Sequence, residues 1–206
     1  MSENPSGSEA HDRRVSISLA GLKGDVETAR SGLNDAAAPV RAAAVSALLR
    51  CEALTSEDVD AAIADPSPLV RRRVCELATS SPPGHFERLL EDAVPEVVEA
   101  AAFACGEQEI ASAVGALATV ATSHSDPLCR ESAVAALGVL GLDAGLPAVL
   151  QAISDVAAVR RRAVIALSNY EGPDVSAALL IALSDRDWQV RQAAEDVIGI
   201  NRTSAQ

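Results

Sequence analysis

Two runs of three arginines are the residues of this chain best suited to bind a ligand: Arg71-Arg72-Arg73 and Arg160-Arg161-Arg162. A guanidinium group is planar and donates paired hydrogen bonds that match carboxylates and phosphates. The chain as a whole is acidic, with 29 Asp and Glu against 17 Lys and Arg and a formal net charge of −12. Cationic runs in such a chain are therefore candidates for contact with an acidic peptide or a phosphate group.

Each arginine run belongs to a longer pattern that recurs six times. The pattern is an acidic turn, a β-branched residue, usually an arginine, and then small residues ending in an apolar pair. Its arginine position stands 27 to 32 residues from the next and is held by Arg41, Arg71, Val98, Arg130, Arg160 and Arg191. A period near 30 residues in a helical composition is typical of an α-solenoid, in which each unit packs only on its neighbours.

Each repeat is expected to contain two helices joined by a tight turn. The first helices are predicted at residues 25–33, 56–63, 84–90, 110–121, 144–153 and 174–183. Each second helix begins near the β-branched residue, and its apolar residues fall at offsets of zero, four, seven and eight, which share one helical face. The fold class predicted from these patterns is all-α: a right-handed α-solenoid of about six two-helix repeats.

The two ends of the chain do not show the repeat pattern. Residues 1–14 have no apolar periodicity and are expected to form a disordered tail. A single repeat domain is expected over residues 15–200, and a second tail over residues 201–206. No stretch reaches the 18 apolar residues of a membrane-spanning helix.

The acidic residue of each turn and the arginine that follows it are expected to have a structural role. Hydrogen bonds between them would form a ladder that ties consecutive turns together. The residues predicted to form this ladder are Asp35, Arg41, Asp65, Arg71, Arg130, Arg160, Asp185 and Arg191.

A partner would bind beside the buried face of the second helices, because these helices usually line the concave surface of a solenoid. The candidate partner-binding residues are Arg72, Arg73, Glu99, Phe103, Glu131, Arg161, Arg162 and Gln192. A second set would form a strip suited to an amphipathic helix if its side chains are exposed, and consists of Val45, Phe103, Val134, Val164 and Ile165.

The Asp of the turn and the Arg early in the second helix resemble the HEAT-like repeats of the phycobilin lyase type, over residues 25–200. This resemblance implies an armadillo-type superhelix. It also implies either a scaffold or an accessory protein that handles a chromophore or another cofactor. Related repeats occur in deoxyhypusine hydroxylases, which use His-Glu dyads for a di-iron site, and in basic alkylpurine DNA glycosylases. This acidic chain has no His-Glu pair.

The sequence therefore predicts a non-catalytic, cytoplasmic interaction module that presents a concave helical surface to a helix or an acidic segment of another protein or peptide. No catalytic, metal-binding or cofactor-binding residues are predicted, and no cofactor is expected. Nucleic acid is not expected as a partner because of the negative charge, and neither is a membrane. A lyase-like or cofactor-handling accessory role is the alternative, and the oligomeric state stays open.

Overall fold

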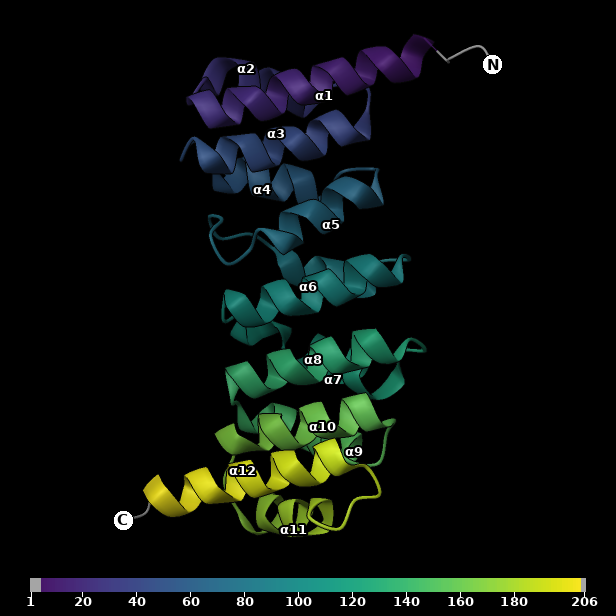
Figure 1. The fold of residues 1–206 in the computed structure, drawn as a ribbon, viewed down its shortest axis with the longest axis vertical. Coiled ribbons are helices and arrows are strands. Elements are labelled where there is room, and N and C mark those ends of the chain that lie inside the picture. The colour runs from purple at the N-terminus through teal and green to yellow at the C-terminus, as the bar shows by residue number, and fades with distance from the viewer. Residues whose placement is uncertain (1–4, 205–206) are drawn as a thin grey trace. The chain divides into compact units, whose positions relative to one another are not determined.

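The computed structural model describes the fold of residues 5–204 and the side chains of residues 8–199. Throughout the described part the chain forms helices joined by turns, without a strand, and pairs of helices pack in a repeat arrangement (Figure 1). The fold is thus the α-solenoid predicted from the period of the sequence. It divides into two compact units, residues 1–89 and residues 90–206.

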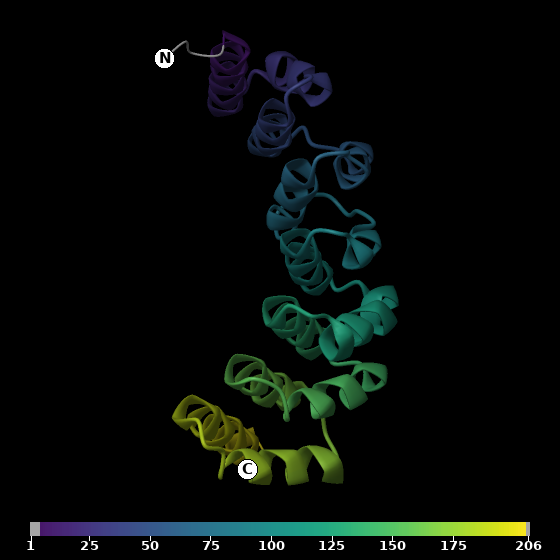
Figure 2. The same ribbon diagram turned by 90° about the vertical axis from the view of Figure 1, so that its right-hand side faces the viewer.

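In the first unit, three longer helices pack side by side in chain order: α1 (Pro5–Lys23), α3 (Ala38–Arg50) and α5 (Pro68–Glu76). A second layer of shorter helices lies against them and consists of α2 (Val26–Ser31), the 3-10 helix η1 (Gly32–Asn34) and α4 (Ser56–Ile63). The 3-10 helix η2 (Phe86–Glu91) follows α5, and Phe86 is fully buried. Figure 2 shows the two layers.

In the second unit, the longer helices that pack in chain order are α6 (Pro95–Glu107), α8 (Pro127–Leu140), α10 (Ala157–Ala166) and α12 (Trp188–Ser204). The opposing layer is formed by η3 (Ala111–Ala113), α7 (Val114–Ser123), η4 (Asp143–Gly145), α9 (Leu146–Ala152), η5 (Leu167–Asn169) and α11 (Pro173–Ala182). The longer helices of both units are the second helices of the predicted repeats, with the exception of α1.

Small residues let the longer helices approach one another closely. A Cβ atom added at Gly21 would lie 2.7 Å from the Cα of Ala47, and one added at Gly138 would lie 2.8 Å from the Cα of Ala166. The predicted apolar face is buried as well: in α3, Val40, Ala44, Ala47 and Leu48 have no exposed surface. Since the chain has few aromatic residues, close contact between backbones fills the core.

The predicted N-terminal tail differs from the structure, because residues 5–14 form the first part of α1. Two interactions hold α1 against the rest of the first unit. Arg13 donates hydrogen bonds to the carboxylate of Asp35, and Ile17 and Ala20 are buried where α1 packs on α3. Met1 to Asn4 lie outside the described residues.

Two other expected boundaries differ. The helix α12 continues to Ser204, into the segment expected as a C-terminal tail, and residues 205–206 lie outside the described part. The first helix expected at residues 84–90 is only the 3-10 helix Phe86–Glu91. Among residues 5–204, no helix is both long and apolar enough to cross a membrane.

Candidate functional site

Three of the ladder arginines, Arg41, Arg130 and Arg160, each connect their own turn to the turn of the following repeat. In the first unit, Nε and Nη2 of Arg41 donate to the two carboxylate oxygens of Asp65, both at 2.7 Å. The remaining Nη1 of Arg41 donates to the backbone carbonyl of Asp35 at 2.9 Å. One guanidinium group therefore satisfies a turn carbonyl and a carboxylate one repeat further along the chain.

The second unit repeats this geometry twice. Arg130 donates to both carboxylate oxygens of Asp155 at 2.7 and 2.6 Å, and Arg160 donates to those of Asp185 at 2.8 and 2.7 Å. Hydrogen bonds from the guanidinium groups lower the pKa of both Asp155 and Asp185. Arg160 is buried, and the Asp185 side chain is 14% exposed, so this pair is partly buried.

The two remaining ladder arginines, Arg71 and Arg191, also donate hydrogen bonds to carbonyl groups of turns. Nη1 of Arg71 donates to the carbonyl of Asp65 at 2.8 Å, and Nη1 of Arg191 donates to the carbonyl of Asp185 at 2.7 Å. All of these side chains are engaged by the protein itself. A ligand would therefore meet other residues of the longer helices.

In the second unit, residues of α6 and α8 enclose a cavity of about 450 Å³, which we call the Phe103 groove. Its lining residues are Glu99, Phe103, Gly106, Glu107, Leu128, Glu131, Ser132, Ala135, Ala136, Val139 and, from α10, Arg162. Four of the eight candidate partner-binding residues are brought together here: Glu99, Phe103, Glu131 and Arg162.

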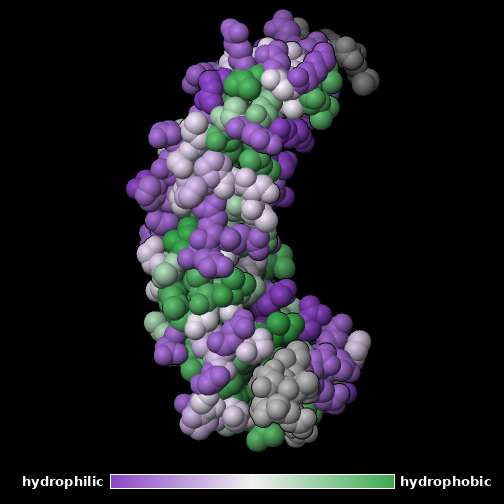
Figure 3. Space-filling view, turned by 90° about the vertical axis from the view of Figure 1, so that its left-hand side faces the viewer, coloured by the Kyte–Doolittle hydropathy of each residue, from purple (hydrophilic) through white to green (hydrophobic). Residues whose placement is uncertain are grey.

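The Phe103 groove combines apolar and acidic side chains. Phe103, Leu128 and Val139 are 44%, 60% and 57% exposed, so three large apolar side chains meet solvent around one groove. Figure 3 shows that hydrophobic residues are exposed among hydrophilic ones on one face of the chain. Arg162 donates a long hydrogen bond of 3.5 Å to Glu131, while its buried Nε has no hydrogen-bond partner.

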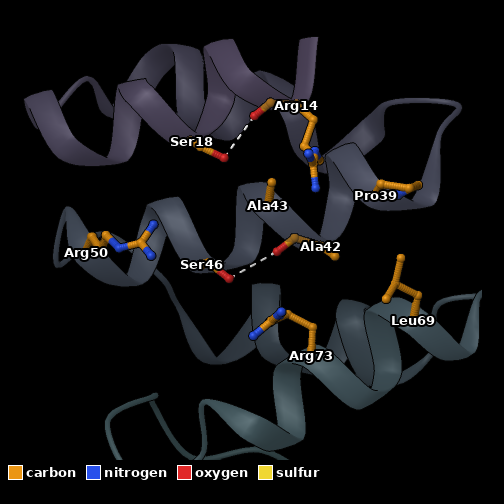
Figure 4. Close-up of a pocket in the computed structure, with 9 residues that line it drawn as sticks. All are labelled: Arg14, Ser18, Pro39, Ala42, Ala43, Ser46, Arg50, Leu69 and Arg73. Atoms are coloured by element: carbon orange, nitrogen blue, oxygen red, sulfur yellow. Dashed lines mark hydrogen bonds between the residues drawn. The ribbon is translucent and has the colours of Figure 1, made fainter. Parts of the chain in front are cut away.

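In the first unit, a smaller cavity of about 260 Å³ lies along α1, α3 and α5, and we call it the arginine pocket. Three arginines line it, one from each helix: Arg14, Arg50 and Arg73 (Figure 4). Arg73 is the only candidate partner-binding residue in this pocket.

The other candidate residues lie outside both cavities. Arg72 is exposed and pairs with Glu76 at 2.7 Å, and Glu76 also pairs with Arg73 at 2.9 Å. Gln192 donates to Asp196 at 3.0 Å, and Arg161 lies on α10 without lining either cavity. Of the eight predicted binding residues, four therefore line the Phe103 groove, one lines the arginine pocket and three line neither.

The predicted apolar strip is only partly exposed. Phe103 and Ile165 are 44% and 42% exposed, whereas Val45, Val134 and Val164 are buried between helices. The offsets of five and six thus do not mark a continuous surface. Phe103 is the member of this set that takes part in a cavity.

Two apolar residues that sequence reasoning missed follow a recognisable signal. Leu128 lines the Phe103 groove and Leu69 lines the arginine pocket. Each follows the proline that begins a longer helix. The next residue is the β-branched or cysteine residue of the repeat pattern, as in Pro68-Leu69-Val70 and Pro127-Leu128-Cys129. A large apolar residue directly after the proline, in the first turn of a longer helix, therefore indicates an exposed apolar side chain.

Cysteine chemistry does not contribute a site. None of the four cysteines forms a disulfide, and Cys75, Cys105 and Cys129 are buried. Burial raises the pKa of Cys129 to about 11, and its Sγ donates to the carbonyl of Pro95 at 3.2 Å. Such a thiol stays protonated and is a poor nucleophile. In the described part of the chain, no three His, Cys, Asp or Glu side chains group in a way that could hold a metal ion.

No family model and no curated protein matches the chain. Among solved structures, human deoxyhypusine hydroxylase in complex with glycerol is 20% identical, with 93% of this chain and 79% of that chain covered and a TM-score of 0.51. Two designed armadillo repeat proteins are each 18% identical, with 89% of this chain and 84% of theirs covered. Their TM-scores are 0.50 and, for the one in complex with the peptide (KR)4, 0.52.

At these identities the likeness shows the helical repeat fold and nothing about activity. The phycobilin lyase type of repeat stays a prediction.

Proposed function

We propose that this protein is a non-catalytic binding module that holds an amphipathic, basic segment of another protein in the Phe103 groove. The observation that carries this proposal is the grouping of three exposed apolar side chains with three glutamates around one cavity on α6 and α8. Grooves of this kind bind a helix through apolar residues spaced along one of its faces.

The apolar part of the groove supplies the anchor. Phe103 projects from α6, while Leu128 and Val139 come from the two ends of α8. An aromatic side chain that a partner covers completely commonly accounts for much of the binding free energy of an interface. Phe103 is therefore the expected centre of the interaction.

The charge of the groove selects the partner. The groove is lined by three glutamates and by one cation, Arg162, so its net charge is negative. The glutamates are Glu99, Glu107 and Glu131. Lysine or arginine residues beside the partner's apolar face would complement this charge. The structure of a designed armadillo repeat protein with the peptide (KR)4 supports the choice, since a basic peptide occupies a protein of similar fold there. The sequence predicted a helix or an acidic segment as the partner; the proposal keeps the helix but replaces the acidic segment with a basic one, because three glutamates line the groove.

The groove is expected to exist before the partner arrives. Gly106 brings α6 so near to α8 that an added Cβ would lie 3.2 Å from the Cα of Ala136. Between the same helices, the thiol of Cys129 donates to the carbonyl of Pro95. A preformed surface avoids the free-energy cost of ordering a loop on binding. Four cysteines without a disulfide support a reducing, cytoplasmic compartment as the place of this activity.

The test is a titration with a fluorescent helical peptide of about four turns, with Leu at i, i+3 and i+4 spacing and Lys elsewhere. Replacing Phe103→Ala should weaken binding about 30-fold, the effect of losing one aromatic anchor. The matched control is Leu180→Ala, which removes an exposed apolar side chain on α11 of the same unit. This control should bind like the unchanged protein.

Charge is tested with a second peptide in which Glu replaces every Lys. The unchanged protein should bind it at least tenfold more weakly than the Lys peptide. Equal binding of both peptides, or equal binding by the Phe103→Ala and unchanged proteins, would rule out the Phe103 groove as the site.

A further inference from the structure

The arginine pocket is a second surface, in the other unit of the chain, and its chemistry is opposite to that of the Phe103 groove. Arg14 of α1, Arg50 of α3 and Arg73 of α5 point toward it from the three longer helices of the first unit (Figure 4). None of its nine lining residues is acidic. In a chain with a net charge of −12, a cavity bounded by three cations and no carboxylate is a local reversal of charge.

The pocket exists because small residues lie between the cations. Ala42 and Ala43 of α3 line it, at the helix positions that Arg72 and Arg73 occupy one repeat later. Short side chains on the middle helix leave a hollow that long side chains on α1 and α5 surround. The cations are thus placed around a space rather than packed against one another.

The arginines are only partly neutralised by the protein. Glu76 is shared between Arg72 and Arg73, so one carboxylate serves two guanidinium groups. Nη2 of Arg14 lies 3.5 Å from His11 Nδ1 and forms no ion pair with a carboxylate of the described residues. Arg50 has neither a hydrogen-bond nor an ion-pair partner among the described residues. Several donors therefore stay available to a ligand.

The hydroxyl groups of the pocket are already engaged. Ser18 donates to the carbonyl of Arg14 at 2.9 Å, and Ser46 donates to that of Ala42 at 3.2 Å. Recognition of a ligand therefore falls to the guanidinium groups, which can only donate hydrogen bonds. A ligand rich in acceptor oxygens and carrying more than one negative charge fits this set best.

A phosphomonoester meets these requirements better than a single carboxylate. It carries a charge of about −1.5 to −2 at pH 7 and offers three strong acceptor oxygens. Arginine forks pair with such a group through two parallel hydrogen bonds. A carboxylate carries one charge and would leave most of the local positive charge uncompensated.

We infer that the arginine pocket binds a phosphomonoester group, held by Arg14, Arg50 and Arg73. This site goes beyond the proposed function, because it lies on the first unit and takes an anionic ligand. Leu69, which is 44% exposed at the pocket, offers an apolar contact to whatever carries the phosphoryl group. The carrier is either a phosphorylated side chain of a protein or a small phosphate ester.

The test is calorimetric titration of the full chain with three probes: inorganic phosphate, a short peptide with a central phosphoserine, and the same peptide with Glu in place of phosphoserine. The phosphopeptide should bind at least tenfold more tightly than the Glu peptide. A phosphopeptide that also binds tenfold more tightly than inorganic phosphate identifies a protein side chain as the carrier. Equal binding of those two probes identifies a small phosphate as the ligand.

Variants tie the binding to the pocket. Arg50→Gln should weaken phosphopeptide binding about tenfold, the effect of one lost hydrogen-bonded charge. Arg50→Lys keeps a cation at the end of α3 but loses the fork, and its binding should be intermediate. The matched control Arg88→Gln removes an exposed arginine of the same unit outside the pocket and should change nothing.

Circular dichroism of each variant checks that the helices are intact. Two results would overturn the assignment: a folded Arg50→Gln variant that binds as the unchanged protein does, or a Glu peptide that binds as well as the phosphopeptide. Absence of binding of every probe at millimolar concentration would overturn it as well. None of these results bears on the Phe103 groove, which the Lys peptide tests separately.

Discussion

Arg13 on α1 donates two hydrogen bonds, of 2.7 and 3.1 Å, to the carboxylate of Asp35 in the turn before α3. This is the same pairing that joins Arg41 to Asp65 one repeat later. The two residues are 22 positions apart in the first pair and 24 in the second. We therefore interpret α1 as equivalent in position to the second helix of a repeat.

The ladder pairs should differ in their contribution to stability according to burial. Replacing Arg160→Met should lower the free energy of unfolding by about 2 to 3 kcal/mol, because it leaves the partly buried Asp185 without a cation. Replacing Arg13→Met should cost less, since the Arg13 side chain is 46% exposed and that of Arg160 only 7%. Urea unfolding of both variants measures the difference, and equal losses would contradict the dependence on burial.

The repeat architecture could be predicted from the sequence because each repeat carries the same short residue pattern. The β-branched residue, the arginine and the small apolar face return every 27 to 32 residues, so a single period identifies all six units. The N-terminal half repeat was missed because Asp12 stands where the other units have a β-branched or cysteine residue. Arg13 and Gly21 do carry the signal, since they are eight residues apart, as are Arg130 and Gly138.

The stability of the protein should fall on acidification. The pKa of Asp35, Asp155 and Asp185 is lowered in the folded chain, chiefly by hydrogen bonds from Arg13, Arg130 and Arg160. A lowered pKa means that the stabilisation is complete above the unfolded value of about 3.9 and is lost as the pH falls through the folded value. The free energy of unfolding should therefore be nearly constant above about pH 5 and decline below about pH 4.

A variant separates the ladder from other carboxylates. Asp155→Asn cannot carry the negative charge, so it should be less stable than the unchanged protein at pH 7 and lose less stability between pH 5 and pH 3. Thermal unfolding followed by circular dichroism across this range measures both effects. Parallel curves for the two proteins would show that Asp155 does not take part in the acid transition.

The candidate sites were harder to predict than the fold, because a cavity depends on residues from several repeats. Arg14, Arg50 and Arg73 are far apart in the sequence and occupy different positions in their helices, so no spacing links them. Glu99, Phe103 and Glu131 were found because they occupy predicted outward positions. The sequence did not predict which residues of the apolar strip are exposed. Val134 and Ile165 were both predicted for this strip, yet only Ile165 reaches the surface.

Glycine substitutions should test the close approach of the longer helices. Gly138→Ala would place its Cβ 2.8 Å from the Cα of Ala166 and 2.6 Å from its Cβ. Overpacking of this kind commonly costs about 1 to 3 kcal/mol. Gly115→Ala on α7 is the matched control, because its Cβ would meet nothing within 4 Å. The control should stabilise the protein by about 0.5 kcal/mol, since alanine favours helix more than glycine does. Chemical unfolding that shows the same sign for both substitutions would contradict the packing argument.

Thiol labelling should report on the contact between α1 and α3. Cys51 is half-buried, and its Sγ lies 3.8 Å from the carbonyl of Gly21, whereas the other three cysteines are buried. A thiol reagent at pH 8 should therefore modify one cysteine of the native protein quickly and three slowly, and Cys51→Ala should abolish the fast phase. Because Arg13 fastens α1 to the turn before α3, Arg13→Met should accelerate the labelling of Cys51 alone. Acceleration of all four thiols would instead indicate global unfolding, and an unchanged rate would show that the Arg13 to Asp35 pair does not hold α1 in place.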